Sequence, residues 1–202
     1  MSMVTLVSGG LDSALMSVLA KEESVHILPL FVDYGQICRD QEWRACIEVH
    51  LKLGLPHPVI MDMSGFGQLI PSGLTNRDMH INEDAFLPGR NLLLLLAGSA
   101  YAYSTNCNGV AIGLLAEEIH LFPDQTREFV KRAQDMIALA MNREIRIVTP
   151  LMNFRKNDVI ELARAKGIEG TYSCHAGTLP TCGSCISCLQ YVTDNMVAKE
   201  ET

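Results

Sequence analysis

The stretch Met3-Val4-Thr5-Leu6-Val7-Ser8-Gly9-Gly10-Leu11-Asp12-Ser13 decides the fold of this 202-residue chain. Its first five residues form a short, mostly apolar run, which is typical of a buried β-strand. A glycine-rich turn follows, where the backbone can reverse direction tightly. Apolar residues then recur on one face at helical spacing; they are Leu11, Ala14, Leu15, Val18 and Leu19. The stretch therefore predicts a strand, a tight turn and a helix in immediate succession.

The turn has the chemistry of an anion-binding loop. In a doubly wound sheet, phosphates bind where a strand passes into a helix, because the first N–H groups of the helix are free and partly positive. Ser8 and Ser13 add hydroxyl donors, whereas Asp12 repels a phosphate unless a cation such as Mg²⁺ lies between them. The loop lacks the Lys of a Walker A loop and the spacing of the G-x-G-x-x-G motif. The alternative is a tight turn in which Asp12 or Ser13 merely caps the helix.

Strand and helix patterns alternate along the rest of the chain. The expected strands span residues 3–7, 26–32, 58–63, 109–115 and 145–148, and the expected helices span 11–19, 43–51, 91–105, 129–140 and 159–163. This alternation predicts an α/β fold with a doubly wound, mostly parallel sheet. Residues 64–88 are punctuated by Gly and Pro without a period, which predicts a long loop that is functional or mobile.

Composition excludes several classes of protein. Hydrophobic residues make up 48% and the net charge is -7, which argues against a disordered chain and against a protein that coats DNA. The longest apolar run, at residues 92–97, is far shorter than the roughly 18 residues of a membrane span. The N-terminus has no signal-peptide pattern. We therefore expect a cytoplasmic protein with no membrane partner.

Four of the seven cysteines crowd near the C-terminus in the pattern C-x7-C-x2-C-x2-C; they are Cys174, Cys182, Cys185 and Cys188. Four thiolates suit a closed, tetrahedral, structural Zn²⁺ site. A redox dithiol and an iron–sulfur centre are the alternatives, and His175 could replace its neighbour Cys174 as a ligand. We expect a nucleotide-binding domain over residues 1–170 and a small zinc-binding segment over 171–202, which is too short for a core of its own.

The first motif resembles the signature loop of the PP-loop ATP pyrophosphatases, which have the adenine nucleotide alpha hydrolase-like fold. Together with the cysteine pattern, it resembles the 7-cyano-7-deazaguanine synthase family of queuosine biosynthesis. Three further motifs agree with that family in order; they are Val32-Asp33-Tyr34-Gly35-Gln36, Leu87-Pro88-Gly89-Arg90-Asn91 and Thr149-Pro150-Leu151. The resemblance runs through essentially the whole chain.

The resemblance implies an ATP-dependent carbon–nitrogen ligase. Its substrates are 7-carboxy-7-deazaguanine and ammonia, its product is 7-cyano-7-deazaguanine, and adenylated intermediates release AMP and pyrophosphate. The implied cofactors and substrates are ATP, Mg²⁺ and a structural Zn²⁺. The implied partner is a small molecule rather than a stably bound nucleic acid. Members of the family often form dimers, so the resemblance also favours a homodimer.

The resemblance also implies roles for individual residues. Asp12 and Arg90 are the catalytic candidates. The ATP-binding candidates are Ser8, Gly9, Gly10, Leu11, Asp12, Ser13 and Asp33. The substrate-binding candidates are Tyr34, Gln36, Arg90, Asn91, Glu118, Asp124 and Arg127. Arg90 suits this task because a guanidinium makes paired hydrogen bonds to a carboxylate or phosphate.

One segment departs from the family's D-x-S-G-Y-P-D-C-R pattern. Here it reads Glu118-Ile119-His120-Leu121-Phe122-Pro123-Asp124-Gln125-Thr126, so the Arg has become Thr126 with Arg127 adjacent. Two interpretations follow: a divergent synthase that uses His120 and Arg127 instead, or a paralogue that adenylates a related acid or amide. A tRNA-thiolating enzyme and a non-enzymatic nucleotide-binding module are further alternatives. The acidic net charge argues against a tRNA-thiolating enzyme. The intact Ser8–Ser13 loop argues against a non-enzymatic module.

Overall fold

The computed structural model describes residues 1–116 and 122–191 and contains one five-stranded sheet. The strands are β1 (Ser2–Val7), β2 (His26–Asp33), β3 (Val59–Asp62), β4 (Gly109–Ala111) and β5 (Arg146–Val148). They are ordered β3-β2-β1-β4-β5, and every neighbouring pair is parallel. The predicted parallel α/β sheet is therefore confirmed.

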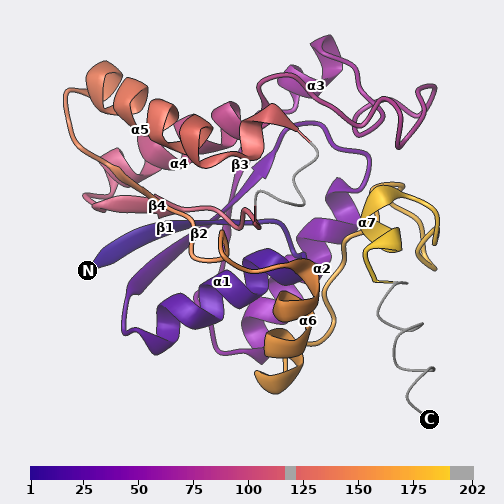
Figure 1. Ribbon diagram of the computed structural model, residues 1–202, viewed down its shortest axis with the longest axis horizontal. Helices are drawn as coiled ribbons and strands as arrows, with labels where there is room; N and C mark the ends of the chain where they lie inside the picture. Colours follow the sequence, from indigo (N-terminus) through magenta and orange to yellow (C-terminus); the bar gives the residue numbers. More distant parts are fainter. Residues whose placement is uncertain (117–121, 192–202) are drawn as a thin grey trace.

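Helices cover both faces of the sheet (Figure 1). The longer ones are α1 (Leu11–Glu22), α2 (Arg39–Lys52), α4 (Arg90–Ser104), α5 (Arg127–Met141) and α6 (Lys156–Ala165). The shorter ones are α3 (Gly65–Leu69), the 3-10 helix η2 (Pro123–Gln125) and α7 (Ile186–Leu189). Helices α4 and α5 lie on one side of the sheet, and α1, α2 and α6 lie on the other.

Alternating side chains of β1 divide the core between these two layers. Val4 and Leu6 pack in the cluster that α4 and α5 contribute to, whereas Met3 packs with α1 and α6. Successive strand residues point to opposite faces, so a strand covered on both faces is apolar throughout. This explains why β1 shows a continuous apolar run instead of an alternating one, and why Val4 is fully buried.

The segment between β3 and α4 is built from turns and one short helix. Helix α3 lies within residues 64–88, and the Gly73 N–H donates to the Asp84 carbonyl at 2.7 Å. Six residues of the 64–88 segment are buried; they are Gly67, Ser72, Gly73, Leu74, Ala85 and Leu87. The sequence shows no period there because a five-residue helix and isolated turns create none. Its mobility stays a prediction.

Strand β4 ends earlier than the expected 109–115 segment. Its partner β5 ends at Val148, and the Ile112 N–H makes the last contact by donating to the Val148 carbonyl at 3.0 Å. Residues 112–116 then leave the sheet and run beside the N-terminus of α1, where a Cβ on Gly113 would lie 3.5 Å from Asp12. This early exit opens space at the carboxyl ends of β1 and β4.

The strand order reverses direction at β1, which pairs with β2 on one side and β4 on the other. In open α/β sheets, the crevice at this switch point is the usual ligand site. Within the described residues, no helix is both long and apolar enough to span a membrane.

Candidate active site

The loop after β1 is closed by its own serines. The Ser8 N–H donates to Ser13 Oγ at 3.2 Å, the Ser13 hydroxyl donates to the Gly10 carbonyl at 3.0 Å, and the Gly10 N–H donates to Ser8 Oγ at 3.3 Å. Helix α1 begins directly after Gly10. The result is a compact turn at a helix N-terminus, the arrangement that binds phosphate oxygens.

Gly9 allows this turn to lie directly on helix α2. Its φ angle is +78°, and a Cβ at this position would lie 2.3 Å from the Glu42 carbonyl oxygen and 2.9 Å from the Cys46 nitrogen. Both the backbone conformation and the space therefore require glycine. Gly9 does not line the cavity described next, so its role is to hold the loop against α2.

The loop forms one wall of a cavity of about 280 Å³ at the switch point. Ser8, Gly10, Leu11, Asp12 and Ser13 line it from the loop. Other lining residues that the sequence predicted are Tyr34, Gln36, Arg90 and Asn91. An adjoining cavity of about 210 Å³ shares Asp12 and Arg90 as lining residues. The structure thus brings most of the predicted ATP- and substrate-binding residues together.

A buried cation faces the loop. Lys156, the first residue of α6, places Nζ 2.7 Å from Asp12 Oδ1 and 5.0 Å from the centre of the Tyr191 ring. Only 12% of the Lys156 side chain is exposed. Burial alone lowers the pKa of this amine, but the Asp12 carboxylate and the Tyr191 hydroxyl outweigh it and raise the pKa. Lys156 therefore stays charged and can neutralise a bound polyphosphate.

Arg90 and Asn91 begin helix α4 and are tied to η2. The Asn91 amide donates to the Asp124 carbonyl at 2.8 Å, and its backbone N–H donates to Asp124 Oδ2 at 3.3 Å. Arg90 Nε donates to Asn91 Oδ1 at 3.3 Å. Asp124 thus holds Asn91, which in turn orients Arg90 at the cavity wall.

Two further predicted residues are directed elsewhere. Asp33 accepts hydrogen bonds from the Gly35 N–H at 2.9 Å and from Arg39 Nε at 3.1 Å, and it does not line the cavity. Arg127 donates through Nη2 to the Met152 carbonyl at 2.9 Å and to Asn153 Oδ1 at 2.6 Å. Glu118 and His120 lie outside the described residues.

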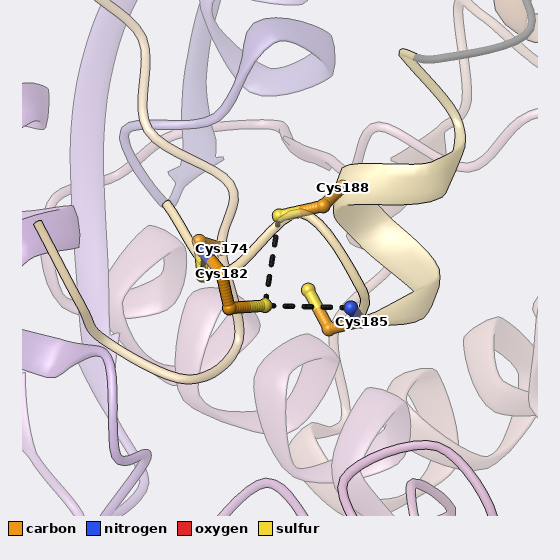
Figure 2. Close-up of side chains that lie close together, drawn as sticks. All are labelled: Cys174, Cys182, Cys185 and Cys188. Atoms are coloured by element: carbon orange, nitrogen blue, oxygen red, sulfur yellow. Dashed lines mark hydrogen bonds between the residues drawn. The ribbon is translucent and has the colours of Figure 1, made fainter. Parts of the chain in front are cut away.

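The four C-terminal cysteines meet in one cluster (Figure 2). Their Sγ atoms all lie within 4.8 Å of one another, and those of Cys182 and Cys188 are 3.9 Å apart. A tetrahedral Zn²⁺ with bonds of about 2.3 Å separates its sulfurs by about 3.8 Å, so the cluster fits this ion. Burial raises the pKa of Cys174, but the Cys182 and Ala176 backbone N–H groups outweigh it and lower the pKa to about 6, which favours the thiolate.

This cysteine segment is attached to the nucleotide-binding body. The Tyr172 N–H donates to the Gly9 carbonyl at 3.0 Å. Asn82 accepts from the Ile186 N–H at 2.8 Å and donates to the Ser184 carbonyl at 3.1 Å. The segment also contributes cavity-lining side chains; they are Ser173, His175, Ser187 and Gln190. The cysteine segment therefore shapes one wall of the site.

Comparison with known proteins identifies the family. The family model described as "Queuosine biosynthesis protein QueC" matches residues 2–193. The chain belongs to the QueC family. The resemblance predicted from the sequence motifs is therefore confirmed.

Three curated relatives that this chain resembles share the name 7-cyano-7-deazaguanine synthase. The chain is 30% identical to a 7-cyano-7-deazaguanine synthase of Campylobacter jejuni subsp. jejuni, over 91% of this chain and 88% of that protein. This chain is 32% identical to the synthase of Prochlorococcus marinus subsp. pastoris, over 93% of this chain and 90% of that protein. It is 30% identical to that of Methanobrevibacter smithii, with 93% and 89% covered.

Solved structures show the same fold at lower identity. A 4-thiouridine synthetase, crystallised as an RNA complex with bound ATP, matches at 18% identity with a TM-score of 0.53, covering 83% of this chain and 41% of that one. The NMN synthetase of Francisella tularensis matches at 18% identity with a TM-score of 0.53, covering 86% and 66%. The PP-loop fold of the QueC family member is thus shared with enzymes of other activities.

The cavity-lining residues that were not predicted include Glu42, Gln125, Lys156 and His175. Burial, followed by the nearby Arg90 charge, lowers the pKa of His175 to about 4, so this ring is neutral near pH 7. Lys156 starts an expected helix, and His175 adjoins a predicted ligand, but neither position alone signals a role. Their contribution comes from contacts between distant parts of the chain.

Proposed function

We propose that this chain is an ATP-dependent carbon–nitrogen ligase that converts 7-carboxy-7-deazaguanine and ammonia into 7-cyano-7-deazaguanine. Membership of the QueC family supports an enzyme of queuosine biosynthesis. The observation that carries the finer proposal is one cavity lined by the phosphate-type loop, the Lys156 cation and the Arg90 guanidinium. These groups suit a substrate pair in which a carboxylate meets a triphosphate.

The loop and Lys156 would hold the pyrophosphate part of ATP. The free N–H groups at the start of α1 and the Ser8 and Ser13 hydroxyls offer hydrogen bonds to phosphate oxygens. Lys156 adds a positive charge that stabilises the negative charge building up on pyrophosphate as it leaves. Asp12 fits as a ligand for Mg²⁺ because its carboxylate lines the same cavity, and a bound Mg²⁺ supplies further charge neutralisation.

Arg90 would bind the acid. A carboxylate is a poor electrophile, so one carboxylate oxygen first attacks the α-phosphorus of ATP and pyrophosphate leaves. Ammonia then displaces AMP from the mixed anhydride and gives an amide. A second ATP adenylates the amide oxygen, and loss of AMP leaves the nitrile. Asn91 is proposed to touch the substrate, whereas Asp124 and Arg127 are proposed to position neighbouring chain segments.

The cysteine cluster is proposed to hold a structural Zn²⁺. With four thiolates, a tetrahedral ion has no open position for substrate. Its contribution would be to fold residues 171–191 against the body, so that Ser173, Ser187 and Gln190 stay at the cavity wall.

A mass-spectrometric product assay tests the proposed function. Purified, zinc-loaded protein would receive Mg-ATP, ammonium and 7-carboxy-7-deazaguanine. We expect the nitrile, with pyrophosphate release that depends on the acid. Asp12→Asn should lower this rate about 100-fold or more, because it removes the carboxylate proposed to hold Mg²⁺ at the reacting phosphates. Asp135→Asn, on the exposed face of α5, should leave the rate unchanged. ATP binding without acid-dependent pyrophosphate release would refute the proposal.

A second candidate is a paralogue that adenylates a related acid. Thr126 stands where the family pattern has Arg, and its hydroxyl accepts from the Phe129 N–H at 3.1 Å as the cap of α5. The neighbouring Arg127 donates to Met152 and Asn153. The same assay with a panel of purine-like acids and amides separates the candidates, since the preferred substrate gives the highest kcat/KM.

A further inference from the structure

Glu42 is a partly buried carboxylic acid at the cavity that neither the sequence motifs nor the proposed ATP contacts account for. It lies on α2 and lines the cavity together with Arg90 and the phosphate-type loop. Its backbone is fixed against that loop, because its carbonyl oxygen lies where a Cβ of Gly9 would be. The backbone of Glu42 is therefore held directly against the loop that is proposed to bind the phosphates.

A hydrogen bond from Gln36 orients the carboxyl group. Gln36 Oε1 accepts from the Tyr34 N–H at 2.9 Å, so its amide nitrogen must point the other way. That nitrogen donates to Glu42 Oε2 at 3.3 Å and to the Val32 carbonyl at 3.4 Å. The neighbouring Cys38 thiol also acts to lower the pKa of the Glu42 carboxyl group. Glu42 is thus held as an acceptor.

Of Glu42 and its neighbours Tyr34, Cys38 and Cys46, only Glu42 has a pKa near 7. Burial raises the pKa of Glu42 to about 7, although Gln36, Cys38 and Arg90 each act to lower it. Burial also raises the pKa of Tyr34 and of Cys38, and it raises that of Cys46 to about 12. These three neighbours keep their protons at pH 7.

We propose that Glu42 is the catalytic base for the attack of ammonia, an inference that rests on the proposed function. The nitrogen lone pair forms the new C–N bond, and the C–O bond to the AMP phosphate breaks with its electron pair going to AMP. The nitrogen must then lose one proton, which passes to a Glu42 carboxylate oxygen and from there to water. On the way to the nitrile the amide nitrogen loses two protons, one as its oxygen is adenylated and one as the C–O bond to AMP breaks, and the same carboxylate takes each in turn and passes it to water.

Measuring two half-reactions distinguishes a role of Glu42 as a base in the nitrogen steps from a role in ATP binding. Acid-dependent exchange of labelled pyrophosphate into ATP, without ammonium, reports adenylation. Nitrile formation with ammonium reports the nitrogen steps. For Glu42→Gln, which keeps size and shape, we expect exchange within about threefold of wild type. We expect kcat for nitrile to fall about 100-fold or more, with KM for the acid little changed. Glu48→Gln, an exposed carboxylate on the same helix, should change neither.

The pH dependence provides a second readout. Total ammonium is adjusted at each pH so that free ammonia stays constant. The base must be ionised to accept a proton, so wild-type kcat should fall as pH drops below about 7. Glu42→Asp should keep this limb at a reduced rate, and the slow residual reaction of Glu42→Gln should lose it. If Glu42→Gln fails to fold, the Glu42→Asp profile carries the test.

The outcomes are distinct. Wild-type nitrile formation in Glu42→Gln overturns the inference, and so does equal loss of exchange and nitrile formation, which indicates a structural or ATP-binding role. Absence of acid-dependent exchange in the wild type overturns the proposed function, and the inference with it. Intact exchange with a selective loss of nitrogen transfer supports both.

Discussion

At the residue scale, Gly9 carries two separate constraints that can be measured apart. One is its left-handed backbone, with φ at +78°, and the other is the missing space for a side chain beside Glu42 and Cys46. Gly167 offers a matched comparison, because its φ is +67° and a Cβ there would meet no atom within 4 Å. The two glycines therefore differ in packing and share the backbone conformation.

Gly9→Ala should destabilise the protein more than Gly167→Ala. Left-handed backbone costs an alanine about 1–2 kcal/mol at either position. Overpacking against α2 should add about 1–3 kcal/mol at position 9. Urea denaturation of both variants measures the free energies of unfolding. Equal losses would contradict the packing argument and would mean that α2 moves away from the loop at little cost.

The same loop shows what local sequence can predict about a site. Ser8, Gly10, Asp12 and Ser13 were predicted because strand, turn and helix N-terminus are consecutive in sequence, so their proximity needs no long-range information. The partner of Asp12 was not predicted. Lys156 lies 144 residues away, and its contact depends on how α6 docks on α1. Glu42 was missed as well; its neighbours Gln36 and Cys38 lie between β2 and α2, whereas Arg90 begins the distant helix α4.

At the element scale, residues 171–191 have few means of folding without the cysteine cluster. Their buried members are Tyr172, Cys174 and Cys185, which form a small group with Cys38 and Ala45 of the body. Such a small core is weak, and metal binding would supply the missing stability. The predicted boundary near residue 170 stays a proposal, and the hydrogen bonds to Gly9 and Asn82 argue that this segment folds together with the body.

Cys185→Ser should remove the metal and loosen this segment. We expect about one zinc per wild-type chain by inductively coupled plasma mass spectrometry, and far less in the variant. The melting temperature should fall by several degrees, because the bound ion no longer stabilises the folded state. Activity should fall with it, since residues of this segment line the cavity.

Cys107→Ser is the matched control for this prediction. Cys107 and Cys185 are equally buried, but Cys107 lies in the main hydrophobic core and accepts from the Thr105 hydroxyl at 3.5 Å. This variant should keep its zinc. Zinc retained in Cys185→Ser, or iron found in the wild type, would contradict the Cys₄ zinc assignment.

The longer elements were predicted more accurately than the short ones for a physical reason. Helix α4 begins and ends one residue before the expected 91–105 helix, because fifteen residues give several repeats of the apolar pattern. Helices α3 and α7 and the 3-10 helix η2 are too short to show a period. Yet η2 contributes Gln125 to the cavity and holds Asn91 through Asp124.

At the scale of the whole molecule, charge separates the proposed enzyme from a tRNA-modifying one. The chain carries 16 Lys and Arg against 23 Asp and Glu, a net charge of -7. Binding to a polyanion depends on neutralising phosphates with basic side chains. The 4-thiouridine synthetase that shares the fold is covered over only 41% of its length, so more than half of that protein has no counterpart here.

We therefore expect tRNA neither to bind this protein tightly nor to alter its reaction. In a gel-shift experiment at low salt, where electrostatic binding is strongest, tRNA should stay unshifted at about 10 μM protein. The rate of acid-dependent pyrophosphate release should be the same with and without tRNA.

Polyglutamate serves as a control polyanion without bases. Inhibition by both polymers would indicate only electrostatic attraction to the ATP site. A shift or rate change specific to tRNA would contradict the small-molecule proposal and favour a thiolating enzyme, because this small acidic chain would then have to present an RNA-binding surface despite its charge.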